Sequence, residues 1–171
     1  MSLFVPNNSE AVIARGVNAE VVGEGPTVGR LLLESSSIGG ALSSLRVILA
    51  KGADGATPHH HTSATELFYV LSGRARILAG KKIVTLEEGD VAAVPPGTPH
   101  AFAATSDSSA DLLIVTSPGI ERFGYFRLLD RVRQGQATFE ELWESQELYD
   151  NHFQDSPEWQ RDRATSRDES M

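Results

Sequence analysis

The sequence predicts an all-β fold, a sandwich or barrel of antiparallel strands, with a short helical extension at the C-terminal end. Up to Pro118 the chain consists of apolar runs of four to nine residues, many with a strand-like alternation of side chains. Turn signals rich in glycine and proline separate the runs at short intervals. No helical pattern of about 10–15 residues lies between them, which argues against a parallel sheet with crossover helices.

Each predicted strand is an apolar run that ends at a turn signal. The run from Leu45 to Leu49 reads Leu-Arg-Val-Ile-Leu, and Gly80 and Gly89 mark turns between later runs. Gly73 predicts a tight turn between the third run and the fourth. In chain order, the predicted strands cover residues 29–35, 41–49, 66–71, 75–78, 83–86, 91–94, 100–104 and 112–116.

The period changes after Pro118, where apolar side chains recur every three residues, close to the helical repeat of about 3.6. This face predicts a first helix and consists of Ile120, Phe123, Phe126, Leu129 and Val132. A second helix is predicted to begin at Thr138, because Thr138 and Glu141 form a capping-box pattern. Ser156 indicates the start of one more helix, and the small, polar and charged residues 161–171 predict a disordered tail.

These patterns predict a single domain, since 171 residues are enough for one sizeable core and too few for two. We expect a β-barrel in residues 1–118, with its chemistry concentrated in residues 52–104. The predicted helices of residues 119–160 would pack on the barrel or on a partner subunit, and residues 161–171 would form the tail.

The composition excludes several classes of protein. With 15 basic and 23 acidic residues, the formal charge is −8, so phosphate backbones would repel the chain and no nucleic-acid partner is expected. The absence of cysteine excludes a disulfide scaffold and thiolate metal sites. Every apolar run is shorter than a membrane span, and residues 1–8 lack the charged and long apolar segments of a secretory signal. We therefore expect a cytoplasmic protein without a membrane partner.

Four of the five histidines lie within 42 residues of one another, in two short segments. If the first segment is a strand, His59 and His61 share one face and His60 points away from it. Glu66 follows after a short connection, at the head of an apolar strand. A Pro-Pro-Gly turn brings His100 to the head of another strand. The two segments can therefore direct three imidazoles and one carboxylate to the same place.

This donor set predicts a metal centre that remains open to a further ligand. Imidazole nitrogen and carboxylate oxygen suit iron, manganese, nickel, copper or zinc, and the lack of thiolate argues against a closed structural zinc site. Four protein ligands leave one or two positions on a metal that prefers five or six. An isolated His-x-His pattern more often lies on the surface beside a turn. Here, however, many positions in the two segments fit one arrangement together.

The two segments resemble the paired motifs of the cupin superfamily, whose members are small jelly-roll barrels (double-stranded β-helices). The residues that carry the resemblance are His59, His61, Glu66, Gly73, Gly89, Pro95, Gly97 and His100. The resemblance covers about residues 40–117 and implies one barrel, because the motif pair occurs once. It further implies that His59, His61, Glu66 and His100 hold one divalent transition metal ion per chain.

A second resemblance, to the quercetin dioxygenase-like cupins, rests on residues 58–68, 94–102 and 116–123. It implies a metal-dependent dioxygenase that acts on a small aromatic or enolic substrate. In such an enzyme Glu66 would be the catalytic residue that takes a proton from the substrate. Ala104 departs from the cupin pattern, which has asparagine at this position, and the change removes a polar group near the pocket.

The candidate substrate pocket consists of Phe68, Phe102, Ala104 and Arg46. If Glu66 points inward, Phe68 does too, and Phe102 follows His100 on the same face. Both phenylalanines therefore belong either to the core alone or also to an apolar pocket wall. Arg46 stands among apolar residues of a predicted strand and either binds a substrate carboxylate or faces solvent.

Two other functions fit the same residues. The protein would be an isomerase or lyase that uses the metal without dioxygen, or a non-catalytic module that binds a small molecule. In each case the expected partner is a small-molecule substrate or ligand. A dioxygenase would also take dioxygen as its second substrate. Leu67, Tyr69 and Leu71 face away from the pocket although they are apolar, so we expect cover by other elements or a homodimer.

Overall fold

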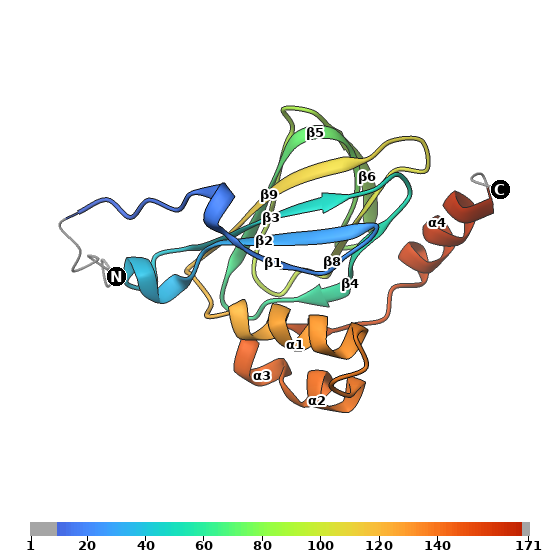
Figure 1. Cartoon of the computed structure of the whole chain (residues 1–171). Coiled ribbons are helices and arrows are strands. Elements are labelled where there is room, and N and C mark those ends of the chain that lie inside the picture. Colours follow the sequence, from blue (N-terminus) through green and yellow to red (C-terminus); the bar gives the residue numbers. More distant parts are fainter. Residues whose placement is uncertain (1–9, 169–171) are drawn as a thin grey trace.

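The computed structural model describes residues 10–168, and its centre is a curled antiparallel sheet that forms an open barrel (Figure 1). The architecture is an all-β jelly roll with short helices at the C-terminal end, as the sequence predicts. The strands are β1 (Glu20–Val22), β2 (Thr27–Leu33), β3 (Ser43–Leu49), β4 (Asp54–His60), β5 (Thr65–Ala79), β6 (Lys82–Glu87), β7 (Val91–Val94), β8 (His100–Ala104), β9 (Ala110–Ser117) and β10 (His152–Phe153).

The described α-helices follow β9 in the chain, whereas the 3-10 helices come before β3. Two short 3-10 helices, η1 (Gly16–Asn18) and η2 (Ser35–Ile38), flank β1 and β2. The α-helices are α1 (Phe123–Arg133), α2 (Phe139–Glu144), α3 (Gln146–Tyr149) and α4 (Pro157–Asp168). Thr138 and Glu141 form the predicted capping box at the start of α2. Within residues 10–168, none of the helices combines the length and apolar character that a bilayer-spanning helix requires.

Strand β5 is the longest of the described strands, and it runs through Gly73. The predicted tight turn at Gly73 is therefore wrong. The first half of β5 pairs with β9 and β7, and its second half pairs with β8 and β6. Gly73 lies between the two halves with φ +75°, and a Cβ atom there would collide with the carbonyl oxygen of Ser109. The glycine therefore bends one continuous strand across the barrel, so the predicted strands 66–71 and 75–78 are a single element.

The core fills the inside of the barrel with alternate side chains of its strands. In β3 the residues Leu45, Val47 and Leu49 are buried, and in β5 Phe68 and Val70 are completely buried. Full burial of such a side chain contributes about 1.5–3 kcal/mol to folding, so the alternating pattern determines which face turns inward. Tyr69 and Leu71 lie on the opposite face of β5 and remain 36% and 38% exposed.

Apart from β4, which the sequence predicts only conditionally, two strands escape prediction because their stability comes from their neighbours. β1 has only three residues and pairs with β2, so its own sequence carries no alternating pattern. β10 lies within the predicted helical extension and pairs with β4, with Phe153 opposite His59. The boundary between barrel and extension at residue 118 therefore stays a prediction, since the chain returns to the sheet after three helices.

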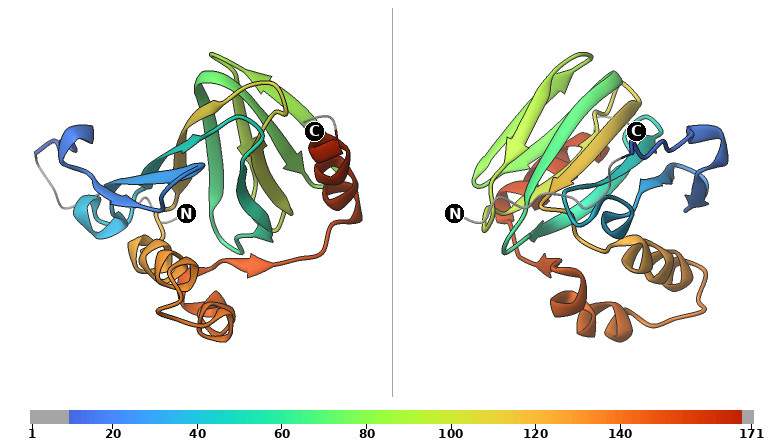
Figure 2. Two further views of the ribbon diagram at one scale, coloured as in Figure 1. Left: turned by 45° about the vertical axis from the view of Figure 1, so that its right-hand side comes forward. Right: turned by 90° about the vertical axis from the view of Figure 1, so that its left-hand side faces the viewer.

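The prediction of a disordered tail from residue 161 is wrong for residues 161–168, which belong to α4, and residues 169–171 lie outside the described part. Trp159 packs on Leu78, Ala101 and Ala103 of the sheet. Arg163 donates hydrogen bonds to the Asp54 carboxylate (2.7 Å) and the Gly52 carbonyl (2.8 Å). Docking on the barrel near β6, visible in Figure 2, stabilises a segment whose polar composition predicts no helix.

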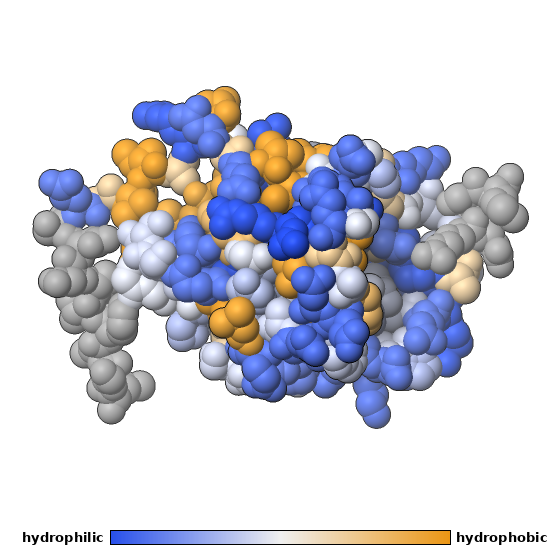
Figure 3. Space-filling model, turned by 60° about the horizontal axis from the view of Figure 1, so that its bottom comes forward, coloured by the Kyte–Doolittle hydropathy of each residue, from blue (hydrophilic) through white to orange (hydrophobic). Residues whose placement is uncertain are grey.

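The helices α1, α2 and α3 form a separate layer below the barrel (Figure 1). The face of the molecule on this side shows hydrophobic patches among hydrophilic residues (Figure 3). Phe139 and Trp143 of α2 are 61% and 50% exposed, and both rings contact Phe153 of β10. This layer covers the end of the barrel where the histidine segments lie.

Candidate metal centre

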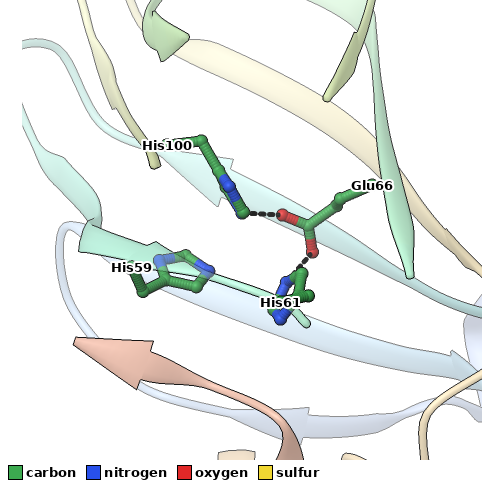
Figure 4. A group of neighbouring side chains, drawn as sticks. All are labelled: His59, His61, Glu66 and His100. Carbon is green, nitrogen blue, oxygen red and sulfur yellow. Dashed lines mark ion pairs between the residues drawn. The ribbon is translucent and has the colours of Figure 1, made fainter. Parts of the chain in front are cut away.

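The four predicted ligands converge inside the barrel (Figure 4). His59 belongs to β4, His61 follows directly after β4, Glu66 is the second residue of β5, and His100 begins β8. Pairing of β4 with β8 places His59 opposite His100. One nitrogen or carboxylate oxygen of each residue lies within 4.8 Å of the others, and all four side chains are buried. The predicted alternation of side chains along this segment is correct, because the ring of His60 lies outside the site and stacks on His152.

Backbone carbonyl groups determine which nitrogen of each histidine is protonated. The Nδ1 atoms of His59, His61 and His100 lie 2.8, 2.6 and 2.9 Å from the carbonyl oxygens of Thr57, Asp150 and Thr98. A carbonyl oxygen only accepts, so each Nδ1 carries the proton and donates it. Each Nε2 atom therefore presents a lone pair to the centre. Histidines that bind metals commonly have this arrangement.

Two of the three histidine lone pairs at the centre lack the donor that burial requires. Nε2 of His100 lies 2.9 Å from Oε2 of Glu66, and Nε2 of His61 lies 3.5 Å from Oε1 of Glu66. Among the described residues, the buried Nε2 atoms of His59 and His100 have no hydrogen-bond partner. Buried acceptors without a donor are costly, whereas a cation satisfies all four at once. The donor set therefore fits a divalent transition metal ion.

The protonation states agree with this fit. Burial by itself raises the pKa of Glu66, but hydrogen bonds that His100 and His61 donate in their protonated forms outweigh it and hold the pKa well below its usual range. Burial lowers the pKa of His59 well below its usual value. A carboxylate that stays ionised and an imidazole that stays neutral are the forms that bind metals.

Asp150 ties the C-terminal layer to the ligand segment. Its carboxylate accepts hydrogen bonds from the backbone N–H groups of Thr62 (2.7 Å) and Ser63 (3.3 Å), next to His61. Its own backbone adopts the left-handed conformation (φ 46°), which aspartate tolerates better than most residues. Because its carbonyl oxygen also binds His61 Nδ1, one residue orients both the ring and the loop that carries it.

Arg122 is a site residue that the sequence analysis does not assign. Its Nη1 atom lies 3.2 Å from both Glu66 Oε1 and His61 Nε2, and its Nη2 donates to Asn151 Oδ1 at 3.0 Å. The guanidinium is buried and lies over the rings of Tyr125 and Phe126. An arginine at the start of an apolar helix carries no motif. The only available signal is a charged side chain within an otherwise apolar helical face.

Glu34 positions the beginning of α1 and with it Arg122. Its carboxylate accepts the backbone N–H groups of Arg122 (3.1 Å) and Phe123 (2.9 Å). These two N–H groups have no partner within the helix, and a carboxylate at this end also interacts favourably with the helix dipole. The contact joins segments 88 residues apart, so local sequence does not reveal it.

A cavity of about 220 Å³ lies beside the candidate ligands His59 and Glu66, and its walls are mostly apolar. His59, Glu66, Arg122 and Asn151 are polar residues that line it, and Phe102 of β8 forms part of the wall. Of the other predicted pocket residues, Phe68 and Ala104 are completely buried in the core and do not line this cavity. Phe68 instead supports the wall, because its ring packs on Phe102 at 5.5 Å and on His100 at 6.1 Å.

Arg46 lies outside the pocket, contrary to the prediction. It occupies a half-exposed position of β3, between the buried residues Leu45 and Val47. Its guanidinium makes two hydrogen bonds to the carboxylate of Asp111 on the neighbouring strand β9. Since adjacent residues of a strand point to opposite faces, burial of Leu45 and Val47 turns Arg46 to the outside.

Comparison with known families agrees with this geometry. Residues 45–116 match the family model of the cupin domain. The match supports a cupin fold for this segment, which we call the cupin domain. It begins within β3 and ends within β9, so it contains all four candidate ligands. The cupin domain does not include Arg122, Asn151 or the helices that cover the open end of the barrel.

Solved structures share the fold of the cupin domain over almost their whole length. KdgF from Halomonas sp. is 20% identical (TM-score 0.54) over 63% of this chain and 94% of that chain. A predicted oxalate decarboxylase from Thermotoga maritima is 21% identical (TM-score 0.55), over 62% and 98%. An RmlC-like cupin from Shewanella frigidimarina is 22% identical (TM-score 0.55), over 67% and 96%. No curated protein matches the sequence significantly.

Proposed function

We propose that this protein is a metal-dependent dioxygenase that acts on a small aromatic or enolic substrate, as quercetin dioxygenase-like cupins do. The observation that supports it best is a buried group of three histidine nitrogens, two of them unpartnered, and one carboxylate beside an apolar cavity. A divalent transition metal ion held by His59, His61, Glu66 and His100 supplies a Lewis acid and, if it is redox-active, a route to dioxygen.

The side chains of the protein orient the substrate and handle its proton. Glu66 is the only carboxylate among the described residues that line the cavity, so it is the base that accepts a proton from an enol or phenol. Arg122 contacts Oε1 of Glu66 and limits the directions in which the carboxylate can turn. Phe102 and the apolar residues of α1 exclude water around a flat substrate.

A second candidate function uses the same residues without dioxygen. One structure with the same fold is named a predicted oxalate decarboxylase, which supports a lyase or isomerase in which the metal stabilises an enolate. A non-catalytic binding module is the third candidate. We also propose a cytoplasmic homodimer that covers the exposed Tyr69 and Leu71, which sedimentation analysis of the purified protein would test.

The experiment begins with elemental analysis of the purified protein and continues with oxygen uptake in the presence of flavonols and catechols. A dioxygenase consumes oxygen only with the substrate and the metal, and Glu66→Gln should lower the rate at least about tenfold. His60→Ala serves as a control, because His60 lies outside the site. Turnover without oxygen would support the lyase or isomerase instead. A ligand that binds tightly and is recovered unchanged would support the binding module.

A further inference from the structure

The charge of the cavity depends on whether a cation is bound. Among the described residues that line the cavity, the charged side chains are Glu66, Arg122 and Arg133, and Arg133 is exposed at the surface. Without a metal, the buried Arg122 guanidinium and the Glu66 carboxylate neutralise each other at 3.2 Å. A divalent cation held by three neutral histidines and Glu66 adds two positive charges, and no further acidic residue among the described lining of the cavity balances them.

The contacts of Arg122 within the protein do not use all of its N–H donors. A guanidinium has five N–H donors. Its Nε atom is buried and has no acceptor among the described residues, and Nη2 has one acceptor, Asn151. Nη1 shares its donors between Glu66 and His61. The Nε2 lone pair of His61 can bind a cation or accept this hydrogen bond but not both, so metal binding releases another donor of Arg122.

We infer that the substrate of this site carries a carboxylate, and that Arg122 binds this group beside the metal and selects for it. The inference rests on the proposed metal-dependent function and specifies its substrate class. A planar carboxylate matches the fork of a guanidinium and supplies the negative charge that the metal-loaded cavity lacks. The apolar walls accommodate the remainder of the molecule, so the substrate class is small aromatic or enolic carboxylates.

The position of Arg122 is well defined before any ligand arrives. Asn151 binds one side of the guanidinium, the rings of Tyr125 and Phe126 lie 5.5 and 5.2 Å from it, and Glu34 anchors the backbone. A guanidinium held in this way loses little conformational freedom on binding a ligand. These contacts come from the β2–η2 junction, α1 and the segment after α3, so segments on both sides of the cupin domain build the recognition site.

The test is calorimetric titration of the zinc-loaded protein with three matched pairs of probes. These are acetate and acetamide, benzoate and benzamide, and 2-hydroxybenzoate and 2-hydroxybenzamide. At least one carboxylate should bind the wild-type protein at least about tenfold more tightly than its amide, and metal-free protein should show no such preference. Arg122→Gln should weaken that carboxylate at least about tenfold with zinc content and circular dichroism unchanged.

Arg127→Gln is the matched control, because Arg127 lies on the same helix but is exposed and pairs with Glu20. Its affinity for the carboxylate should stay within about twofold of the wild type. If Arg122→Gln does not fold, Arg122→Lys tests the inference instead. Lysine keeps the positive charge without the bidentate fork, so the affinity for the carboxylate should fall at least about threefold.

Three results would overturn the inference. The first is wild-type protein that binds none of the carboxylates better than its amide. The second is an Arg122 variant that keeps its zinc and binds the carboxylate as tightly as Arg127→Gln does. Either leaves the proposed metal-dependent function intact. The third is wild-type protein that takes up no metal, which overturns that function as well.

Discussion

The Nε2 atom of His100 lies 2.9 Å from Oε2 of Glu66, while Nδ1–H of the same ring is donated to the carbonyl of Thr98. The contact therefore brings together two buried atoms that each offer a lone pair. A proton or a cation between them removes the repulsion. His59 and His61 also donate their Nδ1–H groups to backbone carbonyls, so one cation can bind the Nε2 lone pairs of all three rings together with Glu66.

Removal of the metal should lower the thermal stability of the protein. A metal present at about 100 times its Kd stabilises the folded state by about 2.7 kcal/mol. For a domain of this size, each kcal/mol corresponds to about 2–4 °C in Tm. We therefore expect chelation to lower Tm by about 5–10 °C in a scanning fluorescence or calorimetric measurement. His100→Ala should show no further decrease with the chelator, and an equal decrease in that variant would point to metal bound elsewhere.

His61→Ala should lower the metal content of the purified protein severalfold without loss of the β-sheet signal in circular dichroism. The substitution removes one of four donors, and the adjacent His60→Ala removes an imidazole that stacks on His152 outside the site. His60→Ala should therefore keep wild-type metal content. Elemental analysis of both variants separates a ligand from a neighbouring histidine. Wild-type occupancy in His61→Ala would contradict the assignment of this ligand.

Asp150→Ala should weaken metal binding by about tenfold, because residues that orient ligands typically contribute this much. The substitution removes the acceptor of the Thr62 and Ser63 N–H groups and strains the left-handed backbone at residue 150. Asp150→Asn keeps one acceptor oxygen and tolerates this conformation, so its affinity should lie between those of alanine and wild type. Competition with a metal-sensitive dye measures all three. Equal affinities would show that the carboxylate does not support the site.

The free energy of unfolding of the metal-free protein should decrease as the pH falls from about 6.5 to about 5. Burial lowers the pKa of His59 in the folded state, whereas the unfolded chain titrates near 6.5. In this window the unfolded state binds a proton that the folded state does not, so acid favours unfolding by up to about 1.4 kcal/mol per pH unit. Glu66 adds nothing here, because its lowered pKa acts only below about 4.3.

Urea denaturation at several pH values measures this dependence, and His59→Gln is the informative variant. Without the imidazole the slope between pH 6.5 and 5 should become smaller, although His60 retains a contribution of the same sign because burial lowers its pKa as well. An unchanged slope in His59→Gln would show that another group causes the pH dependence.

The barrel and the four candidate ligands were accessible from the sequence because both depend on local patterns. Alternation within a strand places His59 and His61 on one face and turns Phe68 inward with Glu66, and burial drives that choice at each position. The same rule correctly excludes His60. Even the capping box at Thr138 involves residues only three positions apart.

Contacts between distant segments decided the rest. Arg122 reaches Glu66 across 56 residues, Asp150 reaches Thr62 across 88, and α4 is held on the barrel by Arg163 and Asp54 across 109. None of these side chains belongs to a recognisable local motif, and their roles come from the direction the chain takes after Pro118. By itself the sequence determined a barrel with a metal-type donor set. Only the tertiary structure decided what faces that donor set, because the facing wall consists of elements whose stability comes from docking.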